Sequence, residues 1–154
     1  LNSAQKKAIA NVELKDVCNF YMGTLAVTID QERNMGVQYN DIVIPRDTKL
    51  PCSISKTYTV MADGQKVIDC SVTQSEGEEK DVEFVNVISN EPLELSKNAK
   101  AGDPIEVTYS YDASGKMHCI FQDKKTKKKH EISLKPVGSK DFKELKDNLD
   151  FDIE

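Results

Sequence analysis

Apolar and polar residues alternate along several short stretches of this chain, and turn-forming residues separate the stretches. Over 105–111 every odd-numbered residue is apolar or aromatic, and 117–121 repeats the alternation after the turn 112–115. A period of two residues is typical of a strand with one buried face. The polar segment 124–129 then leads into a third such stretch at 131–135. We therefore predict an antiparallel meander over 105–135.

Five earlier stretches have the length and composition of short strands, and they are 21–29, 39–44, 55–61, 67–73 and 82–88. The dipeptide Asp63-Gly64 lies between the third and the fourth of them, where it predicts a hairpin turn that pairs the two. Short strands at intervals of about ten residues are typical of a β-sandwich. The predicted fold is mainly β, an antiparallel sandwich of about eight short strands.

The two ends of the chain have a helical pattern instead. Residues 3–14 begin with Ser3, a candidate N-cap, and continue with helix-forming residues. Near the other end, Phe142, Leu145 and Leu149 follow Ser139 at helical spacing. We predict a short C-terminal helix over 140–149.

Composition and charge limit the classes of partner. The chain has 154 residues, of which 38% are hydrophobic and 31% charged, as in globular domains. No apolar run approaches the roughly 20 residues that cross a bilayer, so we expect no membrane partner. The net charge of -5 argues against nucleic acid as the main partner. The lysine-rich segment 124–129 lacks an aromatic residue for base stacking, and we interpret it as a solvated hairpin loop.

Four cysteines, Cys18, Cys52, Cys70 and Cys119, are scattered without a CxxC pair. Zinc sites usually draw their ligands from such closely spaced pairs, so we predict no metal site. Reduced, mostly buried thiols of a cytoplasmic protein are the favoured interpretation. Two disulfides of a secreted protein are the alternative, and a thiol count distinguishes the two.

No pattern of residues points to catalysis. His118 is out of phase with Met117 and Cys119 on its predicted strand, and it therefore points away from them. His130 lies beside the next strand, and the sequence has no motif for a nucleophile, a phosphate-binding loop or a catalytic metal. We expect no catalytic residue and no enzyme activity in this chain. The pattern alone indicates a domain that binds a partner along a strand edge or in an apolar notch.

Four segments, in this order, carry a resemblance to a known family. Residues 16–23 (DVCNFYMG) resemble the motif DVxPxxLG, and 44–51 (IPRDTKLP) resemble IPRNTxIP. Residues 58–78 are similar to a segment with the pattern FxxxxDxQ followed by QGE. The strongest match begins with GDPIEVTY at 102–109 and continues to Ile132. Together these segments resemble the peptide-binding domain of the DnaK-type chaperones, the heat-shock protein 70 family.

The chain also departs from the family pattern. Asn19 replaces the proline of the first motif, and Lys127 replaces the glycine of a T-G-K motif. The segment 28–42 is several residues longer than usual, and 91–100 replaces an apolar, proline-rich loop. We interpret the chain as a divergent member of a bacterial branch.

The resemblance implies a binding site. In the family an extended peptide crosses the top of the sandwich, and one central residue, often leucine, fills an apolar pocket. Carried over to this chain, the peptide-binding residues are Thr24, Ala26, Val27, Tyr58, Met61, Ile68 and Cys70. Ala26 and Met61 would form an arch over the peptide from opposing loops. The alternating residues among them would equally be buried as plain core of any sandwich.

The resemblance also implies a domain organisation and partners. Residues 1–15 would be a linker or the end of a preceding ATPase domain, 16–137 the β-sandwich, and 138–154 the start of a helical lid or a tail. No cofactor is expected in this chain, and ATP would bind elsewhere in the full-length protein. The expected partners are unfolded polypeptides with exposed apolar segments, and co-chaperones. An unrelated all-β interaction or adhesion domain is the alternative.

The tail carries four apolar residues, Phe142, Leu145, Phe151 and Ile153. We expect them to dock in the peptide groove of the same or a neighbouring molecule, which would be a route to self-association.

Overall fold

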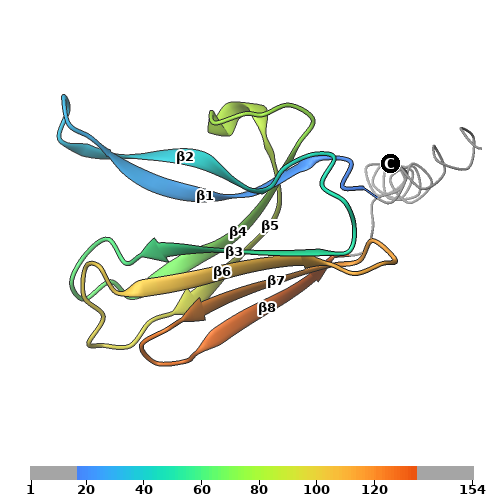
Figure 1. The fold of residues 1–154 in the computed structure, drawn as a ribbon. Coiled ribbons are helices and arrows are strands. Elements are labelled where there is room, and N and C mark those ends of the chain that lie inside the picture. The colour runs from blue at the N-terminus through green and yellow to red at the C-terminus, as the bar shows by residue number, and fades with distance from the viewer. Residues whose placement is uncertain (1–16, 135–154) are drawn as a thin grey trace, which may run out of the picture.

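The computed structural model describes residues 17–134, which form two four-stranded antiparallel sheets (Figure 1). The first sheet contains, in spatial order, β2 (Met35–Ile44), β1 (Tyr21–Asp30), β4 (Val67–Ser75) and β5 (Asn86–Glu94). The second contains β3 (Cys52–Thr59), β6 (Pro104–Tyr111), β7 (Met117–Asp123) and β8 (Lys129–Leu134). The predicted antiparallel sandwich of eight strands is confirmed.

Several predictions fall outside the described residues. These are the helices over 3–14 and 140–149, the four apolar tail residues, and the boundary segments 1–15 and 138–154. Within residues 17–134 the structure holds no helix that is long and apolar enough to span a membrane.

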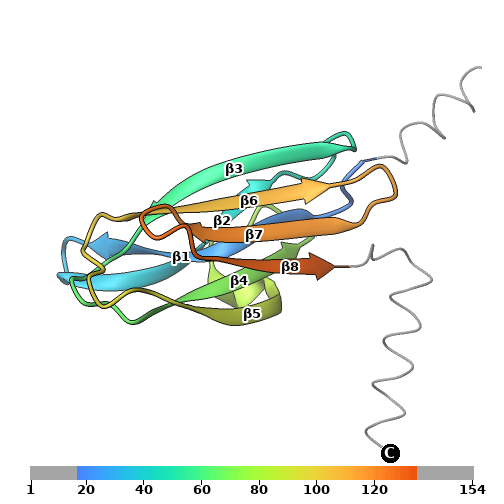
Figure 2. The ribbon, with the colours of Figure 1, turned by 90° about the horizontal axis from the view of Figure 1, so that it is seen from below.

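The core lies between the sheets and is built from alternate residues of each strand. Tyr109 of β6 pairs with Cys119 of β7, which pairs with Ile132 of β8, and all three side chains are buried. The rings of Tyr109 and Phe121 pack edge to face with 6.2 Å between their centroids. Val72 of β4 closes the core from the first sheet. The strands β6, β7 and β8 therefore form the predicted meander, which Figure 2 shows with β3 beside it.

The hairpin predicted at Asp63-Gly64 is wrong. β3 pairs with β6, whereas β4 pairs with β1 and β5, so the strands on either side of this turn belong to different sheets. Gly64 has the positive φ of a tight turn, at 73°. Its N–H donates to Ala99 O at 2.7 Å, and the Asp63 carboxylate accepts from Ala101 N at 2.9 Å. These bonds to the β5–β6 loop hold the turn as a crossing between the sheets.

The strand predicted over 82–88 begins later than expected. Val82–Phe84 form a 3₁₀ helix, η1, and β5 starts at Asn86. The Asp81 side chain accepts a hydrogen bond from Glu83 N at 2.9 Å, and such a local cap competes with the extended backbone of a strand. The loop before η1 folds back onto β2, whose Asn40 N donates to Lys80 O at 2.8 Å.

Candidate functional site

The feature that shapes the site is a two-stranded ribbon, which consists of β1, β2 and the turn between them. β1 pairs with β2 from Met22 to Asp30 but with β4 only over 21–23. Beyond that point the ribbon rises away from the second sheet, as Figure 1 shows. Its outer part exposes apolar side chains, and Val27 is 44% and Ile29 57% exposed. The divergence of the ribbon opens a space between the two sheets.

A pocket of about 350 Å³ occupies this space. Its walls come from 24–27 of β1, 38–39 of β2, 57–59 of β3, 67–69 of β4, and Met61 and Gln65 of the loop between β3 and β4. Ile105, Val107 and Phe121 form the floor. Pockets of this size hold a large side chain or a small ligand. Apolar and aromatic groups from both sheets line it beside polar ones such as Gln38, Thr57 and Asp69, and the apolar floor suits an apolar side chain.

The structure brings six of the seven predicted site residues to this pocket, and they are Thr24, Ala26, Val27, Tyr58, Met61 and Ile68. Cys70 lies apart from them, fully buried in the core with an exposure of 0%. Burial also raises the pKa of its thiol to about 12. Cys70 is thus a core residue of β4, and the pocket above it ends at Ile68 and Asp69.

The predicted arch differs in one respect from the structure. Met61 follows β3 in a loop, as expected, and is 43% exposed. Ala26 is in the middle of β1, opposite Tyr39 of β2, rather than in a loop. The part of the site above the pocket is therefore a strand pair on one side and a loop on the other.

Sequence reasoning missed the contribution of β2 to the pocket. Tyr39 and Gln38 line it, because the register of the ribbon places them opposite Ala26 and Val27. Alternation marked 39–44 as a strand, but alternation does not specify which strand it pairs with or in what register.

Polar groups at the base of the ribbon are bonded within the fold. The Tyr109 hydroxyl donates to Gly23 O at 2.7 Å and approaches Ser71 O at 3.0 Å. The Ser71 hydroxyl accepts from Leu25 N at 2.9 Å and lies 3.1 Å from Thr24 Oγ1. Burial raises the pKa of Tyr109, so its hydroxyl keeps the proton that it donates. These bonds join β1 to β4 and to the second sheet.

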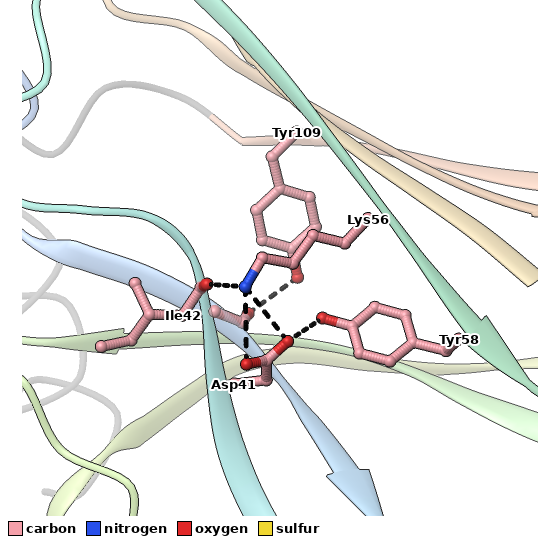
Figure 3. A network of polar contacts seen from close by, with 6 residues as sticks. Asp41, Ile42, Lys56, Tyr58 and Tyr109 are labelled. Atoms are coloured by element: carbon pink, nitrogen blue, oxygen red, sulfur yellow. Dashed lines mark hydrogen bonds and ion pairs between the residues drawn. The ribbon is translucent and has the colours of Figure 1, made fainter.

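A second polar network stands at the margin of the pocket (Figure 3). Asp41 of β2 accepts a hydrogen bond from the Tyr58 hydroxyl of β3, with 2.5 Å between the oxygens. Lys56 Nζ donates to Ile42 O at 2.7 Å and lies 3.4 Å from Asp41 Oδ2. Burial raises the pKa of Tyr58, and the bond to Asp41 raises it further, so Tyr58 is the donor. The network joins the edge strands of the two sheets.

The histidines lie away from the pocket. His118 Nδ1 is 3.2 Å from Ser133 Oγ on the outer face of β7, as its phase predicts, and His130 contacts Glu91. Among residues 17–134, no group of three or more histidine, cysteine or carboxylate side chains is placed to hold a metal ion. All four cysteines have free thiols in the structure, and none of them pairs with another.

An antiparallel sandwich with an apolar pocket beneath a raised ribbon is the class of molecule that these observations define. The model of the family described as Hsp70 protein matches residues 3–149 of the chain. The chain therefore belongs to the Hsp70 family, as a divergent member, and the resemblance seen in the sequence is confirmed. It is similar to the chaperone protein DnaK of Akkermansia muciniphila, with 36% identity over 93 residues. That match covers 60% of this chain and 14% of the relative, so the chain spans a small part of that protein's length.

Proposed function

We propose that this chain is a substrate-binding domain that holds extended, apolar segments of unfolded polypeptides. The observation that carries the proposal is the pocket beneath the ribbon, which gathers six side chains that the family resemblance assigned to peptide binding. One apolar side chain of the peptide would fill the pocket. Removing such a side chain from water contributes about 1.5–3 kcal/mol.

The backbone of β1 supplies a second part of the proposed site. Leu25 N points away from β2, because it donates to Ser71. Alternate residues of an antiparallel pair turn their N–H and C=O groups to the same edge, so those of Val27 and Ile29 also face away from β2. The ladder between β1 and β4 ends at Gly23, and beyond it the described contacts of this edge with β4 are those of Thr24 and Leu25 with Ser71. An extended peptide would bond to this edge as an added strand, which gives affinity with little dependence on sequence.

Family membership extends the proposal to the whole protein. ATP binding and hydrolysis would belong to another part of the full-length chain, and co-chaperones would be further partners. A cytoplasmic location belongs to the same proposal. The alternative of an unrelated interaction or adhesion domain is wrong about ancestry, because the chain belongs to the Hsp70 family.

The test is a fluorescence-anisotropy titration with a labelled, extended peptide that has a single central leucine. We expect saturable binding with a Kd in the micromolar range. Val27→Phe should fill the pocket and raise the Kd at least about tenfold, which is about 1.4 kcal/mol. Val87→Phe is the matched control, because Val87 of β5 is exposed to a similar extent, at 46%, and does not line the pocket.

Two outcomes would count against this function. Wild-type chain that is folded but binds no peptide would contradict peptide binding. Equal loss of affinity in Val27→Phe and Val87→Phe would contradict the pocket beneath the ribbon as the site. Central residues other than leucine, tested in the same format, would show whether Thr24 in the wall shifts the preference of the pocket.

A further inference from the structure

The ribbon is attached to the other elements at its base alone. Within residues 17–134, each hydrogen bond from the ribbon to another element comes from 21–25 of β1 or 40–42 of β2. The outer part, 26–39, is bonded through its own ladder and its own turn. The position of the outer ribbon over the pocket therefore depends on a few contacts at the base.

These contacts differ in how easily they can open. Tyr109, which holds Gly23, is fully buried at 0% exposure. The link from β2 to β3 is partly exposed to solvent, since the side chains of Asp41 and Lys56 are 26% and 38% exposed. Water can replace the partners of an exposed ion pair at little cost. The pair of Asp41 and Lys56 is thus more open to water than the base contacts of Tyr109 and Asn40, which are buried.

The contact of Asp41 lies where it can affect the position of the ribbon over the pocket. Asp41 pairs with Thr24 across the ribbon, and Thr24 is bonded to Ser71 on the opposite side. The base of the ribbon is therefore held by β4 through β1 and, through β2, by β3 and by the bonds of Asn40 to Thr73 and Lys80. Tyr58 belongs both to the network and to the pocket wall (Figure 3). Release of Asp41 and Lys56 together would free the link from β2 to β3 beside the pocket, while the bonds of Asn40 remain.

We infer that Asp41, Lys56 and Tyr58 form a latch that holds the ribbon over the pocket and sets how long a peptide stays bound. The inference rests on the proposed function and adds a means of release to it. With the latch closed, β2 stays against β3 and a peptide beneath the ribbon is confined. With the latch open, the base of the ribbon is held less firmly against both β3 and β4, the outer ribbon moves away from the pocket and the peptide leaves. Asp41 and Lys56 are positioning residues, because they act through the ribbon.

The first test needs no peptide. Leu25 N is bonded to Ser71 and Asn40 N to Lys80, so the exchange of these two amides with solvent reports how firmly the ribbon base is docked. Asp41→Asn keeps the shape of the side chain and removes its charge. We expect amide exchange measured by NMR to be about two to five times faster at both positions. Amides of the second sheet, such as those of Val107 and Cys119, should keep their rates.

The second test measures dissociation of the labelled peptide after addition of excess unlabelled peptide. Asp41→Asn and Lys56→Gln should each raise the dissociation rate by about two to five times, with a much smaller change in the association rate. The double variant should show little more than the larger single effect, because both changes open the same contact. A matched control is Glu106→Gln on β6. It removes the ion pair of Glu106 with Lys124, whose side chains are exposed to an extent similar to those of Asp41 and Lys56.

The outcomes separate the latch from the proposed function. Faster exchange at Leu25 and Asn40 in variants of a chain that binds no peptide would support the latch and overturn the function. Unchanged exchange at both amides would overturn the latch. Faster exchange with unchanged peptide dissociation would overturn its control of release. Equal effects of Glu106→Gln would do the same, because any lost ion pair would then suffice.

Discussion

Tyr109→Phe removes one hydroxyl from a fully buried position between the two sheets. The side chain has 0% exposure, and its hydroxyl donates to Gly23 O at 2.7 Å and approaches Ser71 O at 3.0 Å. The ring itself is retained, including its edge-to-face contact with Phe121. The substitution therefore tests the hydrogen bonds without opening a large cavity.

The expected loss follows from the two acceptors that remain. A buried hydrogen bond stabilises a fold by about 1 kcal/mol net, and a buried carbonyl that loses its partner costs about 1–3 kcal/mol. Gly23 and Ser71 keep neighbouring strand partners, which places the expected loss near the lower end, at about 2 kcal/mol. For a domain of this length the midpoint of thermal unfolding should fall by about 8 °C.

Urea unfolding followed by circular dichroism measures this loss. The free energies of unfolding of Tyr109→Phe and the parent chain are compared with the same m-value, the slope of that free energy against urea concentration. Ser110→Ala is the control, because Ser110 lies on the same strand and bonds Ser53 on the exposed face. Its effect should stay within about 0.5 kcal/mol. A loss below about 0.5 kcal/mol in Tyr109→Phe would refute the reasoning that these bonds hold the ribbon base to the second sheet.

Three further results are expected. Gly23→Ala should destabilise the fold by about 1–3 kcal/mol in the same urea assay, because its Cβ would lie 2.4 Å from Asp41 O. At pH 8 a thiol reagent should modify the partly exposed Cys52 first and spare Cys70 and Cys119 until unfolding, since burial raises the pKa of both to about 12; modification of all four at one rate would contradict this. In the unfolded chain the thiols of Cys70 and Cys119 lose their protons above their ordinary pKa of 9.0, whereas in the folded state they keep them. The stabilisation that comes from this difference is complete below pH 9 and is lost as the pH rises toward 12. Between these limits the free energy of unfolding should fall by about 1.4 kcal/mol per pH unit for each thiol, and a flat profile from pH 8 to 10.5 would contradict the assignment.

The meander could be predicted because its information is local. Residues 105–111 and 117–121 alternate in phase, and the turn between them is short, so the strands had one simple way to pair. The turn at Asp63-Gly64 has the same local chemistry, yet it connects two sheets. What distinguishes it is the bond from Gly64 N to Ala99, a residue far along the chain. A turn signal specifies a change of direction and leaves the partner of each strand open.

In the candidate site too, single residues could be predicted from the sequence, whereas contacts between distant strands could not. Single residues such as Val27 and Ile68 could be assigned from resemblance to a family, and the structure gathers them at one pocket. The latch could not be predicted, because Asp41 and Tyr58 meet through the packing of one edge strand against another. In the sequence Asp41 is one carboxylate within a predicted strand, and nothing local names its partner. Cys70 shows a different limit of the sequence. Its alternation with Ile68 predicts that both side chains lie on the same face of the strand, but it does not predict that Cys70 is buried in the core beyond the pocket.

The way the fold uses its polar groups bears on what the pocket can recognise. Among residues 17–134, every buried side-chain nitrogen and oxygen has a hydrogen-bond partner. Around the pocket, the hydroxyls of Thr24 and Tyr58 are already engaged by Ser71 and Asp41. These two hydroxyls are therefore not available to a ligand, the floor of Ile105, Val107 and Phe121 offers apolar surface, and the edge of β1 beyond Leu25 offers backbone groups. Both kinds of contact ignore most features of side-chain identity. Under the proposed function, a site built in this way would suit many different polypeptides that share only an extended backbone and an exposed apolar residue.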